Sequence, residues 1–123
     1  MKTIIAGSRS IRSYGYLLNA ISSSGFKITK VISGGAKGAD KLGELYANRK
    51  SIPLEIVEAD WELYGKRAGM IRNSQMAERA DALIAIWDGT SSGTKHMIKV
   101  AKEKGLKVYV LYIEQHNVHY NTH

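Results

Sequence analysis

The chain has 123 residues, of which 44% are hydrophobic and 24% charged, a composition typical of one globular domain rather than of a disordered protein. It contains no cysteine, which excludes disulfides, thiolate metal sites and cysteine nucleophiles. Its formal net charge of +7 favours an anionic partner, although charge alone does not separate a small nucleotide from a nucleic acid.

No apolar run approaches the ~20 residues that a membrane-spanning helix needs, so we expect no membrane partner. The first residues lead directly into a short apolar segment that ends in a turn, which is too short for the core of a signal peptide. Together with the absence of cysteine, these features predict a cytoplasmic protein.

The first predicted strand covers residues 3–6 and is followed by the polar sequence GSRS. A helix is expected next, because four side chains recur with helical spacing on one face: Tyr14, Leu17, Leu18 and Ile21. Gly25 lies just beyond this helix and is expected to cap it in the left-handed conformation.

The second predicted strand, residues 30–33, leads into GGAKGAD and then a second helix. The only proline, Pro53, precedes a third strand at residues 54–58, a position where it costs no ladder hydrogen bond. Residues 59–69 (ADWELYGKRAG) show no regular pattern, and their two glycines and two aromatics predict a loop folded over a neighbouring element.

The third predicted helix covers residues 68–79 and the fourth strand is the apolar run ALIAIW at 82–87, the length of a fully buried strand. A fourth helix is expected to begin near Ser92. The β-branched and aromatic run at 107–113 predicts the fifth strand, and residues 114–123 form a polar tail.

Five strands alternating with four helices predict an α/β, Rossmann-like three-layer sandwich with a five-stranded parallel sheet, in the order 3-2-1-4-5. We expect residues 1–113 to form a single nucleotide-binding domain. Ligands of such sheets bind beyond the carboxyl ends of the strands at the switch in strand order, here between the first and fourth strands. The loops after the first, second and fourth strands therefore converge on one edge.

Two glycine-containing loops at this edge are candidate phosphate sites. Residues 34–40 (GGAKGAD) and 88–94 (DGTSSGT) allow close approach of backbone N–H groups, and each precedes a helix whose N-terminus favours an anion. Both are also compatible with ordinary strand-to-helix loops, with Ser92 as N-cap of the later helix. Asp40 can accept ribose hydroxyls or, alternatively, satisfy backbone N–H groups at the start of its helix.

Charged and aromatic side chains supply further candidates for the same edge. Arg9, Arg67 and Arg72 can grip a phosphate bidentately, or can be ordinary surface guanidiniums. Lys37 offers a point charge. Trp61 can stack on a base, although packing is the ordinary role of an aromatic side chain.

The candidate ligand-binding residues are Gly7, Ser8, Arg9, Gly34, Gly35, Ala36, Lys37, Gly38, Asp40, Trp61, Arg67, Arg72, Asn73, Asp88, Gly89, Ser92, Gly93 and Thr94. No catalytic residue and no metal site are assigned. The four histidines do not form a convincing metal-binding set: His96, His116, His119 and His123.

Five segments carry a resemblance to a known superfamily: IIAGSR (4–9), VISGGAKGAD (31–40), ADWELYGKRAG (59–69), IRNSQMAERADALIAIWDG (71–89) and SSGT (91–94). In this order they resemble the SLOG superfamily, which includes the LOG ("lysine decarboxylase-like") enzymes and DprA, and most of all its small stand-alone YspA-like branch. The resemblance implies a Rossmann-like fold, a nucleotide-type ligand with no cofactor required, and a homo-oligomer, either a dimer or larger.

The match to the LOG enzymes is incomplete at the position that matters for catalysis. In those enzymes an Arg-Lys pair precedes the strand, and a GGxGTxxE loop follows it and supplies a glutamate that assists cleavage of an N-glycosidic bond. Arg72 matches the arginine, Asn73 replaces the lysine, and Met97 stands where the glutamate is expected. A thioether cannot act as a general base, so the sequence favours a protein that is not an enzyme.

Three functions follow from the resemblance. The first is binding of a nucleotide, ADP-ribose or cyclic ADP-ribose type of ligand, as a sensor subunit or as a sponge that sequesters a signal, as in viral counter-defence. The second is an enzyme resembling the nucleoside-monophosphate phosphoribohydrolases. The third is a DprA-like nucleic-acid binder, which the positive charge supports.

Overall fold

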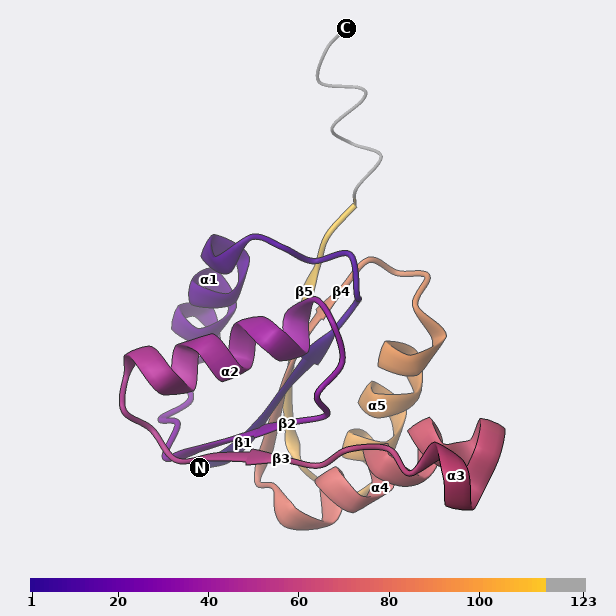
Figure 1. Ribbon diagram of the computed structural model, residues 1–123. Helices are drawn as coiled ribbons and strands as arrows, with labels where there is room; N and C mark the ends of the chain where they lie inside the picture. The colour runs from indigo at the N-terminus through magenta and orange to yellow at the C-terminus, as the bar shows by residue number, and fades with distance from the viewer. Residues whose placement is uncertain (115–123) are drawn as a thin grey trace, which may run out of the picture.

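The computed structural model describes residues 1–114, which form a five-stranded parallel sheet between two layers of helices (Figure 1). The strand order is β3-β2-β1-β4-β5, which confirms the predicted α/β Rossmann-like topology. The strands are β1 (Lys2–Gly7), β2 (Lys30–Ser33), β3 (Leu54–Ile56), β4 (Ala82–Trp87) and β5 (Lys107–Tyr112). Most of the predicted tail, with His116, His119 and His123, lies outside the described residues.

The helices cover the two faces of the sheet separately. On one face lie α1 (Tyr14–Ser24) and α2 (Ala39–Arg49), and on the other lie α4 (Ala68–Arg79) and α5 (Ser92–Glu103) (Figure 1). The short helix α3 (Trp61–Tyr64) and the 3-10 turn Gly65–Arg67 connect β3 to α4. No helix within residues 1–114 combines the length and the apolar character needed to cross a membrane.

Burial on both faces explains the continuous apolar sequence of β4. Leu83 and Ala85 pack into the core beneath α4 and α5, whereas Ile84 and Ile86 pack into the core beneath α1 and α2. All four side chains are completely buried. A parallel strand covered on both faces has no solvent-facing positions, which is why polar alternation is absent from this run.

Some local predictions were wrong. Leu18, which the helical spacing grouped on one face with Leu17, is 43% exposed, because α1 packs on the sheet through Leu17 and Ala20. The stretch predicted as an irregular loop contains α3. Asp60 is the N-cap of this helix, and its Oδ1 accepts a hydrogen bond from the Leu63 N–H.

The prediction for the end of α1 is confirmed. Gly25 caps this helix in the left-handed region, with φ of 69°.

Truncating Leu17 to alanine should lower the free energy of unfolding by about 2–5 kcal/mol, because the side chain is fully buried and leaves a cavity. Leu18→Ala is the matched control in the same helix and should cost well under that amount. Urea denaturation of both variants measures the difference, and equal losses would contradict the packing of α1 described above.

Candidate functional site

A cleft of about 550 Å³ opens at the carboxyl edge of the sheet. The loops after β1, β2 and β4 meet there with α3 and the first turns of α4 and α5. It is lined by Ala6, Gly7, Arg9, Ser10, Ala36, Asp40, Trp61, Gly69, Arg72, Asn73, Met76, Asp88, Ser91, Ser92, Gly93, Thr94 and Met97. The volume lies within the range of small-molecule sites.

Most of the candidate residues come together in this cleft: Gly7, Arg9, Ala36, Asp40, Trp61, Arg72, Asn73, Asp88, Ser92, Gly93 and Thr94. The remaining candidates do not line it: Ser8, Gly34, Gly35, Lys37, Gly38, Arg67 and Gly89. Arg67 borders a separate hollow of about 350 Å³ beside α4. Lys37 is exposed, away from the lining.

Ser8 supports the floor of the cleft from below. Its N–H donates to the Ile86 carbonyl at 2.9 Å, and its hydroxyl accepts from the Asp88 N–H at 3.0 Å. Gly7 precedes it at a close approach of the two strands, because a Cβ there would lie 2.1 Å from the Ile86 carbonyl oxygen. Gly38 is packed as closely, since its Cβ would lie 2.4 Å from the Ser8 carbonyl oxygen.

Asp88 shapes the loop after β4. Its Oδ1 accepts hydrogen bonds from the N–H groups of Thr90 and Ser91, both at 2.9 Å. Ser91, rather than the predicted Ser92, caps α5, because its hydroxyl accepts from the Thr94 N–H. Aspartate side chains commonly accept a hydrogen bond from the backbone two residues on, as Asp88 does from Thr90, and this preference is the local sequence signal for the turn.

The N-terminus of α5 is open toward the cleft. The first N–H groups of a helix have no partner within it, and the Ser91 cap takes only that of Thr94. Ser92 and Gly93 are exposed and line the cleft, and no atom lies within 4 Å of a Cβ built on Gly93. The first turn of α5 lacks an acidic residue, and the nearest carboxylate of the cleft is that of Asp88 in the preceding loop.

Arg72 and Asn73 join three segments around the cleft. Arg72 donates from Nη1 to the Gly34 carbonyl at 2.6 Å and from Nε to Asn73 Oδ1 at 3.3 Å. Because Nε can only donate, the Asn73 oxygen faces it and Nδ2 faces α5. That Nδ2 lies 3.3 Å from the Gly93 carbonyl and 3.0 Å from His96 Nδ1, which therefore accepts.

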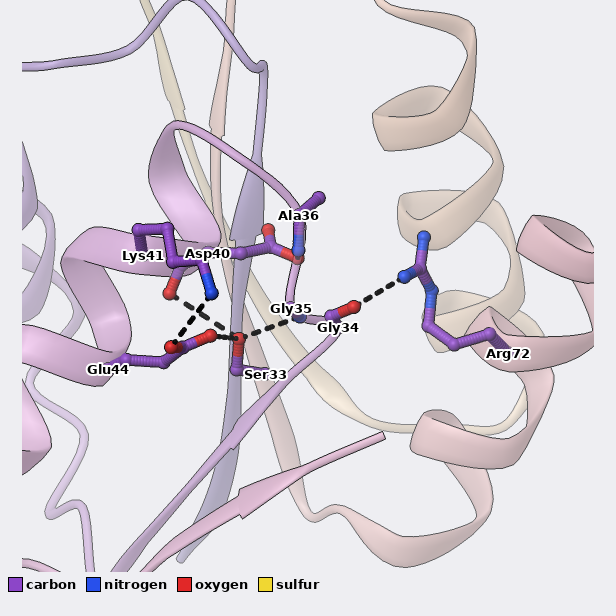
Figure 2. A network of polar contacts seen from close by, with 8 residues as sticks. All are labelled: Ser33, Gly34, Gly35, Ala36, Asp40, Lys41, Glu44 and Arg72. Atoms are coloured by element: carbon purple, nitrogen blue, oxygen red, sulfur yellow. Dashed lines mark hydrogen bonds and ion pairs between the residues drawn. The ribbon is translucent and has the colours of Figure 1, made fainter. Parts of the chain in front are cut away.

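The loop after β2 is held by a connected polar network (Figure 2). Asp40 Oδ2 accepts from the Ala36 N–H at 3.2 Å, and the Ser33 hydroxyl accepts from the Gly35 N–H at 3.1 Å. Ser33 in turn donates to Glu44 at 2.7 Å. Figure 2 shows Arg72 reaching this loop from α4, across from Asp40.

Asp40 is a buried carboxyl that lines the cleft. Only 4% of the residue is exposed, and this burial raises its pKa from 3.8 to about 6. The hydrogen bond from the Ala36 N–H and the positive charge of Arg72 oppose the rise, while the negative charge of Glu44 adds to it. Asp40 thus accepts its hydrogen bond from the loop that precedes α2, rather than from a backbone N–H group of the helix itself.

Asp88 shows the opposite shift. Burial acts to raise its pKa, but the hydrogen bonds from the N–H groups of Ser91 and Thr90 outweigh that effect and hold it below the usual range. The cleft therefore contains one carboxyl, that of Asp88, which the hydrogen bonds of its loop keep ionised. The other, that of Asp40, has a pKa of about 6.

The floor of the cleft is apolar where the resemblance to LOG enzymes would place a glutamate. Met97 is 1% exposed and packs in the core beneath α4 and α5, together with Met76. Residues 1–114 contain no cluster of three or more histidine or carboxylate side chains placed to hold a metal.

Comparison with known proteins identifies the family. Residues 1–64 match the sequence model of the YspA, cpYpsA-related SLOG family. The chain belongs to this SLOG family. A related sequence is the Gene 61 protein of Mycobacterium phage D29, which is 37% identical over 84 residues, or 63% of this chain and 67% of that protein.

A solved structure shares the SLOG fold. The X-ray structure of DNA processing protein A (DprA) from Streptococcus pneumoniae superposes with a TM-score of 0.70 and 18% sequence identity. The match covers 89% of this chain and 49% of that one, so this chain spans about half the length of that protein. At this identity the likeness concerns the fold alone.

Replacing Asp40 with asparagine should flatten the pH dependence of stability. Since the folded pKa of about 6 lies above the ordinary 3.8, the folded state binds more protons between these values. The contribution of Asp40 to stability is therefore greatest below pH 4 and lost as the pH rises through 6. Between pH 4 and pH 7, the parent should lose on the order of 3 kcal/mol more than Asp40→Asn.

Urea denaturation of the two proteins at both pH values gives this difference directly. Asparagine can still accept the Ala36 N–H, and all other titrating groups are common to both proteins. Parallel pH profiles would mean that Asp40 does not titrate in this window.

Proposed function

We propose that the cleft binds a nucleotide-derived ligand, of the nucleotide, ADP-ribose or cyclic ADP-ribose type, without cleaving it. The observation that carries this proposal is the open N-terminus of α5, where Ser92 and Gly93 line the cleft with free space around Gly93. Such a helix end favours a phosphate through its N–H groups and its dipole. SLOG membership supports a nucleotide-related role.

Two arginines complement this helix end. Arg72 is held in place by the Gly34 carbonyl and by Asn73, so little further ordering is needed for it to meet a phosphate. Arg9 lines the cleft from the loop after β1 and is exposed. Together they offer positive charge to the cleft from α4 and from the loop after β1.

The absence of turnover is inferred from the carboxylates of the cleft. Glycosidic cleavage needs a carboxylate positioned at the reacting bond, and the buried thioether of Met97 offers none. Asp88 is engaged by the N–H groups of its own loop, and Asp40 by that of Ala36.

A protein that binds a nucleotide signal without consuming it serves either as a sensor subunit or as a sponge. The similarity to a protein of Mycobacterium phage D29 supports the second role, because sequestering a host signal is useful in viral counter-defence. We also expect a homo-oligomer, which light scattering of the purified protein would test.

Calorimetry with a panel of nucleoside monophosphates, ADP-ribose and cyclic ADP-ribose isomers should reveal a ligand. Arg72→Ala should then weaken its binding by roughly 1.5–3 kcal/mol, the range for a hydrogen bond to a charged group. Arg67→Ala is the matched control, because this arginine does not line the cleft. Equal affinities for the parent and Arg72→Ala would remove Arg72 from the site.

Incubation of the protein with the same panel should release no free base, as followed by chromatography. Base release that is lost in Arg72→Ala would refute the binder and establish an enzyme. Asp40→Asn would then show whether that carboxyl replaces the missing glutamate. With no release, Met97→Glu tests whether the rest of a cleavage site is intact, because added activity would require it.

Nucleic-acid binding is an alternative function, favoured by the formal net charge of +7. Each phosphate contact to a nucleic acid releases counterions, so its affinity falls steeply with salt. A single nucleotide should show only a shallow dependence. Titration of a single-stranded oligonucleotide and of a mononucleotide at two salt concentrations separates the two functions.

A further inference from the structure

The two tryptophans of the chain are in contrasting situations. Trp87 donates its indole N–H to the Ser91 carbonyl at 3.0 Å and meets Tyr112 edge-on, with ring centroids 6.5 Å apart. Trp61 is 56% exposed, and its indole N–H has no hydrogen-bond partner among residues 1–114. An exposed indole leaves a large apolar surface in water, which is unfavourable unless something covers it.

The backbone holds Trp61 at the cleft. It is the first residue of α3, and the Asp60 cap fixes this turn by accepting the Leu63 N–H at 3.0 Å. The outer edge of the indole, at Cη2, lies 3.7 Å from the position a Cβ would take on Gly69, which also lines the cleft. The absence of a side chain at Gly69 therefore leaves the space beside the ring open.

Position distinguishes Trp61 from the other large apolar side chains that are exposed in residues 1–114. Leu63, Tyr64 and Met70 lie nearby in the sequence but do not line the cleft. Only Trp61 combines an exposed aromatic ring with the same cavity that contains Arg72 and the N-terminus of α5. A cavity of about 550 Å³ also holds more than a phosphate.

We propose that the exposed face of Trp61 stacks on the base of the bound nucleotide, so that the cleft takes a base-bearing nucleotide rather than a sugar phosphate. The proposal rests on the proposed function, because it assumes a phosphate at the α5 end of the same cleft. Every base has a π-face, so the stacking selects for the presence of a base and only weakly for its identity.

The experiment compares adenosine 5′-monophosphate and ADP-ribose with ribose 5-phosphate by calorimetry, for the parent, Trp61→Leu, Trp61→Phe and Leu63→Ala. The parent should bind at least one of the two nucleotides more tightly than ribose 5-phosphate. Trp61→Leu should weaken nucleotide binding by about 5- to 150-fold and leave ribose 5-phosphate unchanged. Trp61→Phe should retain most of the affinity, because it keeps an aromatic face, and Leu63→Ala should match the parent.

Tryptophan fluorescence gives a second measurement, because a purely structural role of Trp61 would not make its emission depend on the nucleotide. Stacking should quench the emission of Trp61, so the nucleotide-dependent quench should disappear in Trp61→Phe while Trp87 still emits. Thermal unfolding of the variants should be close to that of the parent, since Trp61 is exposed.

The failure of this proposal can be told apart from failure of the proposed function. Equal affinity for ribose 5-phosphate and the nucleotides, or equal losses for both classes in Trp61→Leu, would overturn stacking while leaving phosphate binding in place. If neither class binds, the proposed function and the stacking fall together. Loss of self-association in both Trp61→Leu and Leu63→Ala, with nucleotide binding unchanged, would instead make α3 a protein-docking surface.

Discussion

The pairing of β1 with β4 at the centre of the sheet is the interaction on which the cleft depends. β1 leads into α1 on one face of the sheet and β4 leads into α5 on the other. The connections that follow the two strands therefore diverge at this point. Ser8 ties them together below the gap, through Ile86 and Asp88. The close approach at Gly7 admits no side chain, so the separation of the two loops is set by backbone contacts.

Arg72 and Asn73 connect three segments that surround the cleft: α4, the loop after β2, and α5. A single guanidinium bonds the loop after β2 through Gly34, and the neighbouring amide bonds α5 through Gly93 and His96. The loop and the two helices therefore cannot move independently without breaking polar contacts. Under the proposed function, such mutual support would reduce the entropy lost on binding, because the helix N-terminus is already positioned in the free protein.

The two aspartates of the cleft illustrate how environment sets the charge of one residue type. Asp88 receives two backbone hydrogen bonds, which hold its pKa below the usual range. Burial, with a smaller contribution from the neighbouring Glu44, raises the pKa of Asp40 to about 6. Arg72 faces Asp40 and partly compensates its charge. A phosphate near Arg72 would compete with Asp40 for the same cation, which links ligand binding to the protonation of this carboxyl.

The sequence by itself determined the order of elements, the parallel sheet and the edge at which the loops meet, because apolar runs such as that of β4 and the glycine loops are local patterns. Only the tertiary structure decided which side chains reach the cleft. The Ser8 hydroxyl bonds the Asp88 N–H, a partner distant in the sequence. Ser91 rather than Ser92 caps α5, and Leu18 is exposed to solvent, because the position of a helix start and the packed face of a helix each change with a shift or rotation of one residue. The hydrogen bond from Arg72 to Gly34 joins positions 38 residues apart, and no local pattern contains such a contact.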